Sequence, residues 1–142
     1  MFMITKAGLI PYVVENGQIK MLFMVSSDAR FGGPDPMISK GNIDPGETPE
    51  QAAIREAEEE LGLQLSNMIS HPFLITSEKI KGMDLEYFMN IYACEVADTT
   101  SFSTPHYETA ETVWLTLEQF EAIGRPLHRP IVQLAISEIT GR

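Results

Sequence analysis

Residues 39–63, SKGNIDPGETPEQAAIREAEEELGL, carry four glutamates at positions 56, 58, 59 and 60. In a helix with roughly 100° between successive residues, Glu56, Glu59 and Glu60 fall on one arc, and Glu58 points away from it. Carboxylate oxygens are hard ligands of the kind that Mg²⁺ and Mn²⁺ prefer. A solvated acidic face is the other interpretation, because like charges one turn apart cost only about 0.2–0.5 kcal/mol when exposed. The spacing alone leaves both interpretations open.

The segment that carries this cluster has the signals of a short helix with two well-marked ends. Thr48 suits the N-cap with Gln51 completing a capping box, and Pro49 suits the first helical position. Gly62 suits the left-handed residue that follows a helix. The narrow apolar face of this helix consists of Ala53, Ile54, Ala57 and Leu61. We therefore predict a helix over residues 49–61, with this face packed and the acidic arc beside it.

Residues 41–63 resemble the Nudix box, G-x5-E-x7-R-E-U-x-E-E-x-G-U, in which U is aliphatic. Its fixed positions are filled by Gly41, Glu47, Arg55, Glu56, Glu59, Glu60 and Gly62. Ala57 is the one soft departure, since it is smaller than the usual aliphatic residue. The resemblance implies an α/β/α sandwich with a mixed central sheet. It also implies a hydrolase that acts on a nucleoside diphosphate linked to another moiety and depends on Mg²⁺ or Mn²⁺.

The resemblance also implies a role for each residue of the box. The implied metal ligands are the main-chain carbonyl of Gly41 and the carboxylates of Glu56, Glu59 and Glu60. Arg55 is expected to orient Glu59 through a charge-assisted pair, and Glu47 is expected to brace the junction between loop and helix. Divalent ions between the carboxylates and a diphosphate would neutralise its charge, activate a water and stabilise the leaving oxygen. Such ions make the crowding of acidic residues tolerable.

The general base is expected either in the box, as Glu59 or Glu60, or in a late loop. The loop before Trp114 offers Glu108 and Glu111. Diadenosine tetraphosphate and RNA pyrophosphohydrolases place a functional glutamate six residues before a comparable tryptophan, and the matching position here is Glu108. A loop carboxylate that only faces water is the competing interpretation, and Glu111 is the second candidate.

Two further resemblances predict contacts with the substrate. The stretch ISKGNIDPGE is similar to the PKGxxxxGE of diadenosine tetraphosphate hydrolases, with Ser39 in place of proline, so Lys40 is expected to contact phosphate. The stretch KIKGMDLEYFMNIYACEV is similar to the hairpin in which an aromatic residue stacks on adenine, and Tyr87 is the first candidate there. A half-buried strand tyrosine is the competing interpretation. The other aromatic candidates are Phe88, Phe31, Phe102 and Tyr107.

A dinucleoside polyphosphate similar to diadenosine tetraphosphate is therefore the leading substrate. The alternatives are a nucleoside triphosphate, ADP-ribose, the 5′ triphosphate of RNA, and a Nudix module that senses a nucleotide without cleaving it. With 20 acidic against 10 basic residues, the net charge of −10 repels long nucleic acid and argues against the RNA substrate. The box keeps all its carboxylates, which argues against a sensor. We expect a small-molecule nucleoside polyphosphate as the partner.

Outside the box, the pattern predicts a mixture of strands and helices that does not repeat as βαβ units. The predicted strands are 7–14 and 19–27, joined by an Asn-Gly turn, a short strand 37–40, strands 67–79 and 85–96 joined by a turn at Gly82, and a last strand 112–115 after a long loop 97–111. Thr116 suits the cap of a helix 117–124, and a final helix is expected to turn Ile131 and Leu134 toward the core. The predicted fold class is α/β of the α+β kind.

The bulk properties of the chain limit its organisation and its location. A length of 142 residues is most simply one domain, 1–142. No stretch approaches the roughly 18 apolar residues that span a bilayer, and the first residues lack the pattern of a signal peptide. Cys94 is the single cysteine, so it cannot form an internal disulfide. We expect a soluble cytoplasmic protein, either a monomer or a homodimer.

The sequence leaves its histidines and two late arginines without a firm role. His71, His106 and His128 lie far apart along the chain, and we assign none of them to the site. Arg125 and Arg129 either bind phosphate or cap a surface loop, and capping is the commoner role.

Overall fold

A computed structural model describes residues 4–31, 34–81, 86–100 and 102–142. The strands are β1 (Ile4–Glu15), β2 (Gln18–Ser26), β3 (Ser39–Asn42), β4 (Phe73–Lys81), β5 (Glu86–Glu95) and β6 (Thr109–Leu115). The α-helices are α1 (Pro49–Leu61), α2 (Leu117–Ile123) and α3 (Arg129–Thr140), and short 3₁₀ turns are η1 (Ala29–Phe31), η2 (Leu65–Asn67) and η3 (Pro126–His128). Among these described residues, no helix has the length and apolar character needed to cross a membrane.

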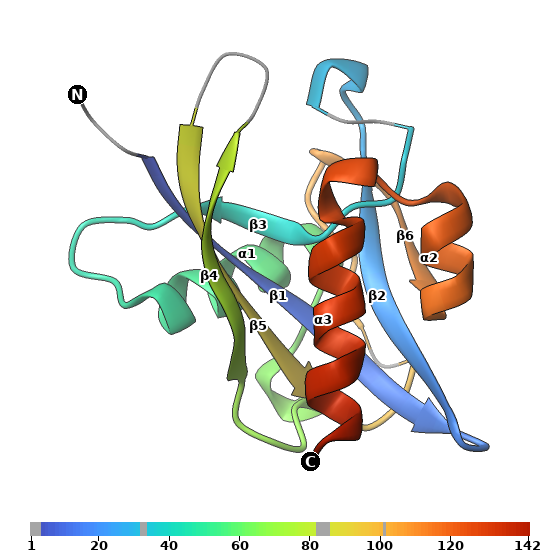
Figure 1. Ribbon diagram of the computed structural model, residues 1–142. Coiled ribbons are helices and arrows are strands. Elements are labelled where there is room, and N and C mark those ends of the chain that lie inside the picture. The colour runs from blue at the N-terminus through green and yellow to red at the C-terminus, as the bar shows by residue number, and fades with distance from the viewer. Residues whose placement is uncertain (1–3, 32–33, 82–85, 101) are drawn as a thin grey trace.

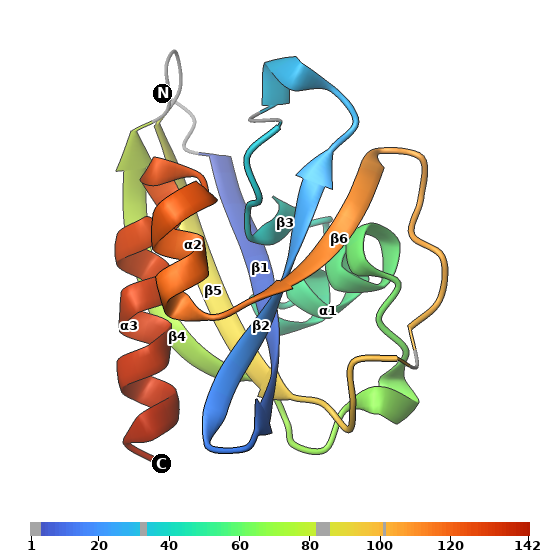
Figure 2. The same ribbon diagram turned by 90° about the vertical axis from the view of Figure 1, so that its right-hand side faces the viewer.

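The strands form one mixed sheet between two layers of helix (Figures 1 and 2). The strand order is β4-β5-β1-β2-β6, and β3 pairs with β1. Strands β1 and β5 are parallel, and the other pairs are antiparallel. Helix α1 covers one face of the sheet, and α2 and α3 cover the other (Figure 2). This arrangement confirms the predicted α/β/α sandwich with a mixed central sheet.

Strand β1 lies at the centre of the sheet and is buried on both faces. Its residues alternate between a layer against α1 and a layer against α3. The first layer holds Ala7, Leu9 and Val13, and the second holds Ile10 and Tyr12. The hairpin to β2 turns through Asn16 and Gly17, which both have positive φ, at 53° and 77°. Two such residues in a two-residue loop are typical of the type I′ turn that the Asn-Gly pair predicts.

Helix α1 begins and ends where the sequence predicts. Thr48 and Gln51 form the capping box, with Gln51 N donating to Thr48 Oγ1 at 3.1 Å, and Gly62 takes the left-handed conformation at φ 75°. The buried face of α1 consists of Ala52, Ala53, Ala57 and Leu61, while Ile54 is only half-buried. These small side chains let the helix lie close to β1 and β3, which brings its acidic arc next to the sheet.

Three predicted elements differ from the structure. Strand β4 begins at Phe73 instead of residue 67, because η2 comes first and the Asn67 side chain accepts a hydrogen bond from Gln64 N. Strand β6 begins at Thr109, inside the predicted loop 97–111, since it pairs with β2. Leu134 is 39% exposed, so its predicted core position is wrong. The inward positions of α3 are Ile131, Val132, Ala135 and Ile139. The predicted turn at Gly82 lies outside the described residues.

Candidate active site

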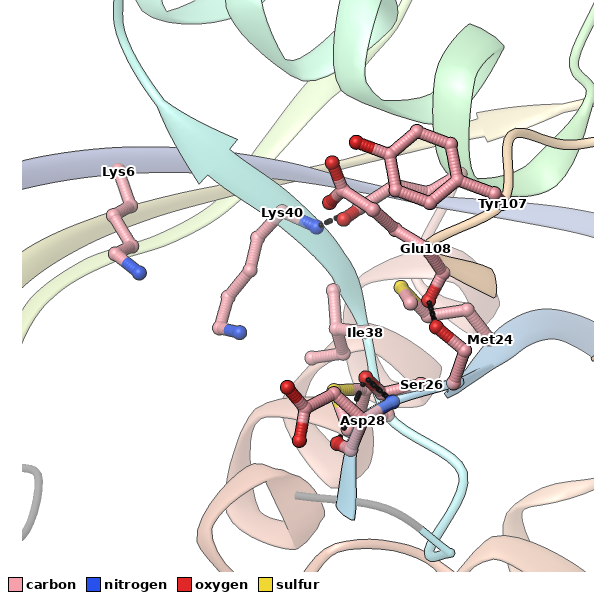
Figure 3. A pocket seen from close by; sticks show the side chains of 11 residues that line it. Lys6, Met24, Ser26, Asp28, Ile38, Lys40, Tyr107 and Glu108 are labelled. Carbon is pink, nitrogen blue, oxygen red and sulfur yellow. Dashed lines mark hydrogen bonds between the residues drawn. The ribbon is translucent and has the colours of Figure 1, made fainter. Parts of the chain in front are cut away.

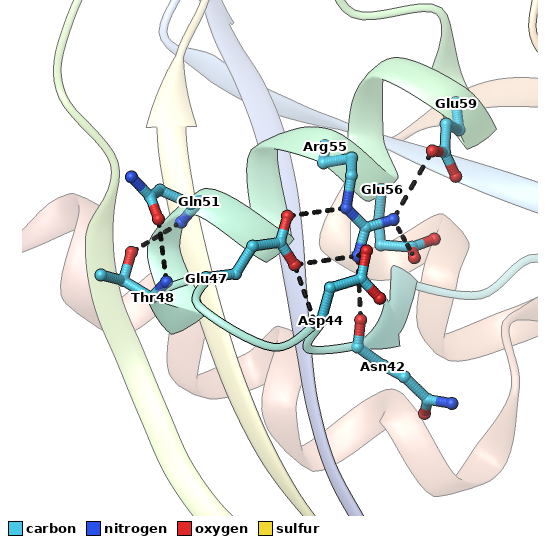
Figure 4. Close-up of polar contacts among 8 residues, drawn as sticks. All are labelled: Asn42, Asp44, Glu47, Thr48, Gln51, Arg55, Glu56 and Glu59. Atoms are coloured by element: carbon cyan, nitrogen blue, oxygen red, sulfur yellow. Dashed lines mark hydrogen bonds and ion pairs between the residues drawn. The ribbon is translucent and has the colours of Figure 1, made fainter.

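Arg55 lies at the centre of a polar network that fixes the loop before α1 against the helix (Figure 4). Its Nε donates to Glu47 Oε2 at 2.7 Å, and its Nη2 donates to the carbonyl oxygen of Asn42 at 2.9 Å. Its Nη1 donates to Glu56 Oε1 at 2.9 Å. Hydrogen bonding to Glu47 raises the pKa of Arg55 above its already high value, so the guanidinium stays charged. The network holds the loop and the Glu56 carboxylate in one place.

The contacts of Arg55 differ from those that the box implies. Arg55 Nη1 lies 3.5 Å from Glu59 Oε1, which is an ion pair but a longer contact than those to Glu47 and Glu56. The Glu59 side chain is 39% exposed, whereas that of Glu56 is 13% exposed. Glu47 makes the expected bracing contact, because its Oε1 accepts from Asp44 N at 2.9 Å across the turn. Arg55 therefore positions Glu47 and Glu56 more firmly than Glu59.

Gly41 on β3 lies directly against the Glu56 carboxylate. A Cβ at Gly41 would collide with the carboxyl carbon and both carboxylate oxygens of Glu56. Burial raises the pKa of Glu56, and the charges of Glu59 and Glu108 act in the same direction against the opposing effect of Arg55. The absence of a side chain at Gly41 is what lets a carboxylate and the backbone of β3 approach each other here.

Glu60 lies one turn further along α1 and contacts the same strand. Its Oε1 accepts hydrogen bonds from Ser39 Oγ at 2.8 Å and from Lys40 N at 2.9 Å. Burial, with the nearby charge of Glu56, raises the pKa of Glu60 to about 7. Among the described residues, no cation lies within ion-pair distance of this carboxylate. Glu60 is thus a largely buried acid without a paired positive charge.

The loop that carries Glu108 is tied to the C-terminal end of α1 by hydrogen bonds. Ser103 N donates to the Gly62 carbonyl at 2.7 Å, and His106 N donates to the Glu59 carbonyl at 2.8 Å. Thr109 Oγ1 donates to the Glu60 carbonyl at 2.9 Å. On the other side, Ser27 N donates to the Glu108 carbonyl at 2.9 Å. These bonds hold the Glu108 backbone between α1 and the end of β2.

A cleft of about 470 Å³ opens where the Glu108 loop, the end of β2 and β3 meet (Figure 3). Its polar lining includes Lys6, Asp28, Lys40, Glu60, Tyr107 and Glu108. Four residues singled out from the sequence, Lys40, Glu60, Tyr107 and Glu108, are therefore brought together on one cavity. The box residues Gly41, Glu56 and Glu59 lie beside this cavity and do not line it. Glu111 is exposed on β6 and also lies outside the lining.

The aromatic candidates for stacking on a nucleobase differ in their burial and in whether they line the cleft. Tyr87 is 8% exposed and belongs to the core packed against α3, so its ring faces are not open to a nucleobase. Phe102 packs edge-to-face on Trp114, with ring centroids 5.7 Å apart, and Phe88 does not line the cleft. Tyr107 is 87% exposed and lines the cleft beside Glu108. The side chain of Phe31 lies outside the described part of the molecule.

The acidic residues fit a divalent cation by their chemistry, although they do not form a closed cage. Within the described ranges, no three Asp, Glu, His or Cys side chains converge as a ready set of metal ligands. The donors at hand are the Glu56, Glu59 and Glu60 carboxylates and the backbone of Gly41, which are hard oxygen ligands suited to Mg²⁺ or Mn²⁺. The glycine at 41 leaves the space in which carboxylate and carbonyl oxygens can face one ion.

His128 is a buried residue for which no sequence pattern predicts a role. Its Nδ1 accepts a hydrogen bond from Ile38 N at 3.1 Å, which fixes η3 to the strand segment that leads into Lys40. Its Nε2 has no hydrogen-bond partner among the described residues. Burial, and then the charges of Lys40 and Arg125, hold the pKa of His128 well below 6.5. Burial of a histidine by residues far away in the chain leaves no signal in a single sequence.

We expect His128 to make the fold less stable as the pH falls. Its pKa is low in the folded state and about 6.5 in the unfolded state, so between these values only the unfolded chain binds the proton. The contribution to stability is therefore complete above about pH 6.5 and is lost below it, by up to about 1.4 kcal/mol per pH unit. In urea unfolding between pH 5 and 7, the free energy of unfolding of His128→Gln should change less with pH than that of the wild type. His71→Gln, at an exposed histidine, is the control and should keep the wild-type slope.

Comparison with known proteins identifies the family. The family profile described as NUDIX domain matches residues 7–135. An uncharacterized Nudix hydrolase, orf19 of Rhodococcus erythropolis, is 39% identical over 57 residues, which are 40% of this chain and 31% of that protein. The chain thus aligns with less than a third of the length of this curated relative.

The solved structures that resemble this chain share its whole fold. The C. elegans Ap4A hydrolase in a binary complex has a TM-score of 0.80 and 19% identity, over 98% of this chain and 99% of that one. The NUDIX domain of Shewanella oneidensis NrtR, complexed with ADP ribose, has a TM-score of 0.76 and 12% identity, over 98% and 90%. Since the family profile covers nearly all of the chain and the box is complete, the protein is a member of the Nudix family.

Proposed function

We propose that this protein hydrolyses a phosphoanhydride bond in a small nucleoside polyphosphate with the help of a divalent metal ion. A dinucleoside polyphosphate of the diadenosine tetraphosphate kind is the proposed substrate. The observation that carries the proposal is the meeting of Glu60, Glu108, Lys40 and Tyr107 on one cleft next to the box helix. Acid, base, phosphate-binding and stacking groups are the parts that such a reaction requires.

The proposed metal ligands are Glu56, Glu59, Glu60 and the carbonyl of Gly41, with Arg55 holding Glu56 in place. A bound Mg²⁺ or Mn²⁺ would neutralise the phosphates and lower the pKa of a bound water. Glu60 is proposed to hold the ion with its carboxylate, and since burial raises its pKa to about 7, a bound cation would replace a proton there near neutral pH. Glu108, which lines the same cleft, is proposed to take a proton from the attacking water.

The remaining groups of the cleft orient the substrate. Lys40 is proposed to bind the phosphate chain as a point charge. Tyr107 is proposed as the surface on which a nucleobase stacks, because its ring is open to solvent at the rim. The C. elegans Ap4A hydrolase has the same fold, and this similarity supports a dinucleoside polyphosphate as the substrate. The net charge of −10 suits a small anion that arrives together with its metal.

A nucleotide panel tests the proposal. Diadenosine tetraphosphate, ATP, ADP-ribose and a 5′-triphosphorylated oligoribonucleotide would each be incubated with Mg²⁺, with Mn²⁺ and with EDTA. We expect the highest kcat/KM for diadenosine tetraphosphate with either metal, and no turnover in EDTA. Product masses in ¹⁸O-labelled water would identify the phosphorus that is attacked. Tight binding of any nucleotide without cleavage would instead identify a sensor, and undiminished turnover in EDTA would exclude the metal ligands.

A further inference from the structure

The cleft has two chemically different ends (Figure 3). Glu108 points its carboxylate toward α1, the helix that carries Glu60, whereas Lys6 and Lys40 extend their ammonium groups away from that side. The Asp28 carboxylate lies on the lysine side of the cleft and is paired with Arg30 at 2.8 Å. Because the backbone N of Lys40 donates to Glu60 while its side chain extends from the other face of β3, the strand separates the two ends. The acidic end carries the proposed hydrolysis, and Lys40 is the one residue of the basic end to which the proposed function assigns a role.

The pairing of β1 with β3 fixes Lys6 and Lys40 as neighbours. Lys6 is opposite Asn42, and Gly8 is opposite Lys40, in an antiparallel register. Lys6 and Lys40 are thus diagonal neighbours on one face of the sheet, about 7–8 Å apart at the backbone, within reach of long side chains. A Cβ at Gly8 would come within 2.9 Å of Lys40 Cβ, so the glycine leaves the space through which Lys40 extends.

Arg125 does not line the cleft, but it lies close enough to Lys40 for its positive charge to act on it. Its N donates to the Pro36 carbonyl at 2.8 Å, which docks the start of η3 on the segment that leads into β3. Burial, and then the positive charges of Lys6 and Arg125, lower the pKa of Lys40 to about 8. Arg129, in contrast, donates to the Gly124 carbonyl at 3.0 and 3.2 Å and has the capping role that was the commoner expectation.

In the part of the chain that the structure describes, these three cations form no ion pair with a carboxylate. Within the described residues, neither Lys6, Lys40 nor Arg125 has a carboxylate within 4.0 Å, although acidic residues outnumber basic ones by 20 to 10. Lys6 Nζ instead lies 5.1 Å from the centroid of the Tyr87 ring, and Tyr87 is itself fixed in the core. An aromatic face attracts a cation without neutralising it, so the positive charge remains available to a ligand.

We infer that Lys6 and Arg125, together with Lys40, bind the phosphates of the substrate that lie beyond the bond that is cleaved, and that Tyr87 is a positioning residue for Lys6. The inference rests on the proposed function and adds to it a preference for substrates with longer phosphate chains. A tetraphosphate or pentaphosphate chain spans from the acidic to the basic end. ADP-ribose has only two phosphates, which the acidic end engages, so it gains little from the basic end. The cleft thereby selects for phosphate number.

Binding of inorganic tripolyphosphate in EDTA tests the basic end without metal and without catalysis. Lys6→Met and Arg125→Met should each weaken this binding by about tenfold in calorimetry, the effect of losing one charge-assisted contact. Lys20→Met is the matched control, since it removes a positive charge that pairs with Glu15 at 4.0 Å, away from this cleft. Binding by Lys6→Met and Arg125→Met within twofold of the control would overturn the inference.

Kinetics separate this inference from the proposed function. In Lys6→Met and Arg125→Met, KM for diadenosine tetraphosphate and pentaphosphate should rise about tenfold, with kcat and the KM for ADP-ribose within twofold of wild type. An equal rise for all substrates would overturn the preference for phosphate number. If wild type cleaves no nucleotide while tripolyphosphate binding still depends on Lys6 and Arg125, the proposed function fails and the anion site stands.

Substitutions of Tyr87 test the positioning role. Tyr87→Phe keeps the ring and should bind tripolyphosphate as wild type does. Tyr87→Leu keeps an apolar side chain without the ring and should bind it about threefold more weakly, as expected for losing an exposed cation–π contact. Thermal unfolding of both variants checks that the core is intact. If Tyr87→Phe and Tyr87→Leu bind tripolyphosphate equally well, Tyr87 does not position Lys6. The phosphate-binding role of Lys6 itself is decided by the Lys6→Met experiments.

Discussion

Glu60→Gln is expected to lower kcat by roughly 10²–10⁴-fold while leaving the fold intact. Glutamine presents an amide oxygen that still accepts from Ser39 Oγ and Lys40 N, so the contact with β3 is kept. It has no charge with which to hold a divalent cation or to accept a proton. The measurement is turnover of the best substrate at saturating Mg²⁺, with calorimetry of Mg²⁺ binding in the presence of a non-hydrolysable analogue.

The same substitution is expected to stabilise the metal-free protein at alkaline pH. The pKa of Glu60 is raised to about 7, chiefly by burial, so between its unfolded value near 4.5 and 7 the folded state binds the extra proton. Glu60 therefore makes its full contribution to the free energy of unfolding below about pH 4.5, and this contribution is lost as the pH rises through 7. Urea unfolding in EDTA at pH 8 should give Glu60→Gln a free energy of unfolding about 1–3 kcal/mol above wild type.

Glu58→Gln is the matched control for both measurements. Glu58 lies on the same helix, is exposed, and points away from the acidic arc. Its replacement should leave kcat within twofold and should not increase stability at pH 8. If Glu60→Gln keeps wild-type turnover, or if both variants lose it equally, Glu60 has no specific role. A variant that is inactive but less stable than wild type would indicate that its hydrogen bonds, and not its charge, are the important feature.

Local signals in the sequence predicted the elements that a few adjacent residues determine. The capping box of Thr48 and Gln51 and the left-handed Gly62 delimit α1, and the Asn16–Gly17 turn sets the register of β1 against β2. Predictions that depended on more distant partners were less accurate. Strand β6 extends to Thr109 because β2 lies beside it, and α3 turns Leu134 outward because of how it packs on the sheet.

The part of the site that the Nudix box carries could be predicted from the sequence. Lys40, Glu60 and Glu108 meet on one cleft, although Glu108 is brought there by hydrogen bonds from residues that carry no motif. Tyr87 is the first candidate for stacking on adenine by resemblance, but strand periodicity does not tell which face of β5 packs against α3. Arg125 resembled a loop cap as closely as Arg129 did. Only the docking of η3 on the segment before β3 distinguishes them.

Glu108→Gln is expected to reduce kcat by roughly 10²-fold or more, with KM for the nucleotide nearly unchanged. Glu108 lines the same cleft as Glu60, and its charge contributes to the raised pKa of Glu56, so it lies close to the proposed metal ligands without belonging to the box helix. A base in that position removes a proton from water and makes little contact with the ground-state substrate. Initial rates at saturating metal over a range of nucleotide concentrations separate the effect on kcat from that on KM.

Glu111→Gln distinguishes a base at Glu108 from a general effect of negative charge on this loop. Glu111 is three residues away, exposed, and paired through its backbone with Val25 on β2. Its replacement removes the same charge from the same part of the chain, yet its carboxylate does not line the cleft, so kcat should stay within twofold. Loss of activity in Glu111→Gln alone would move the base to the second candidate. Wild-type rates in both variants would indicate that the general base is a glutamate of the box. Glu59 would then be the candidate, because its side chain is exposed to water and its contact with Arg55 is longer than that of Glu56.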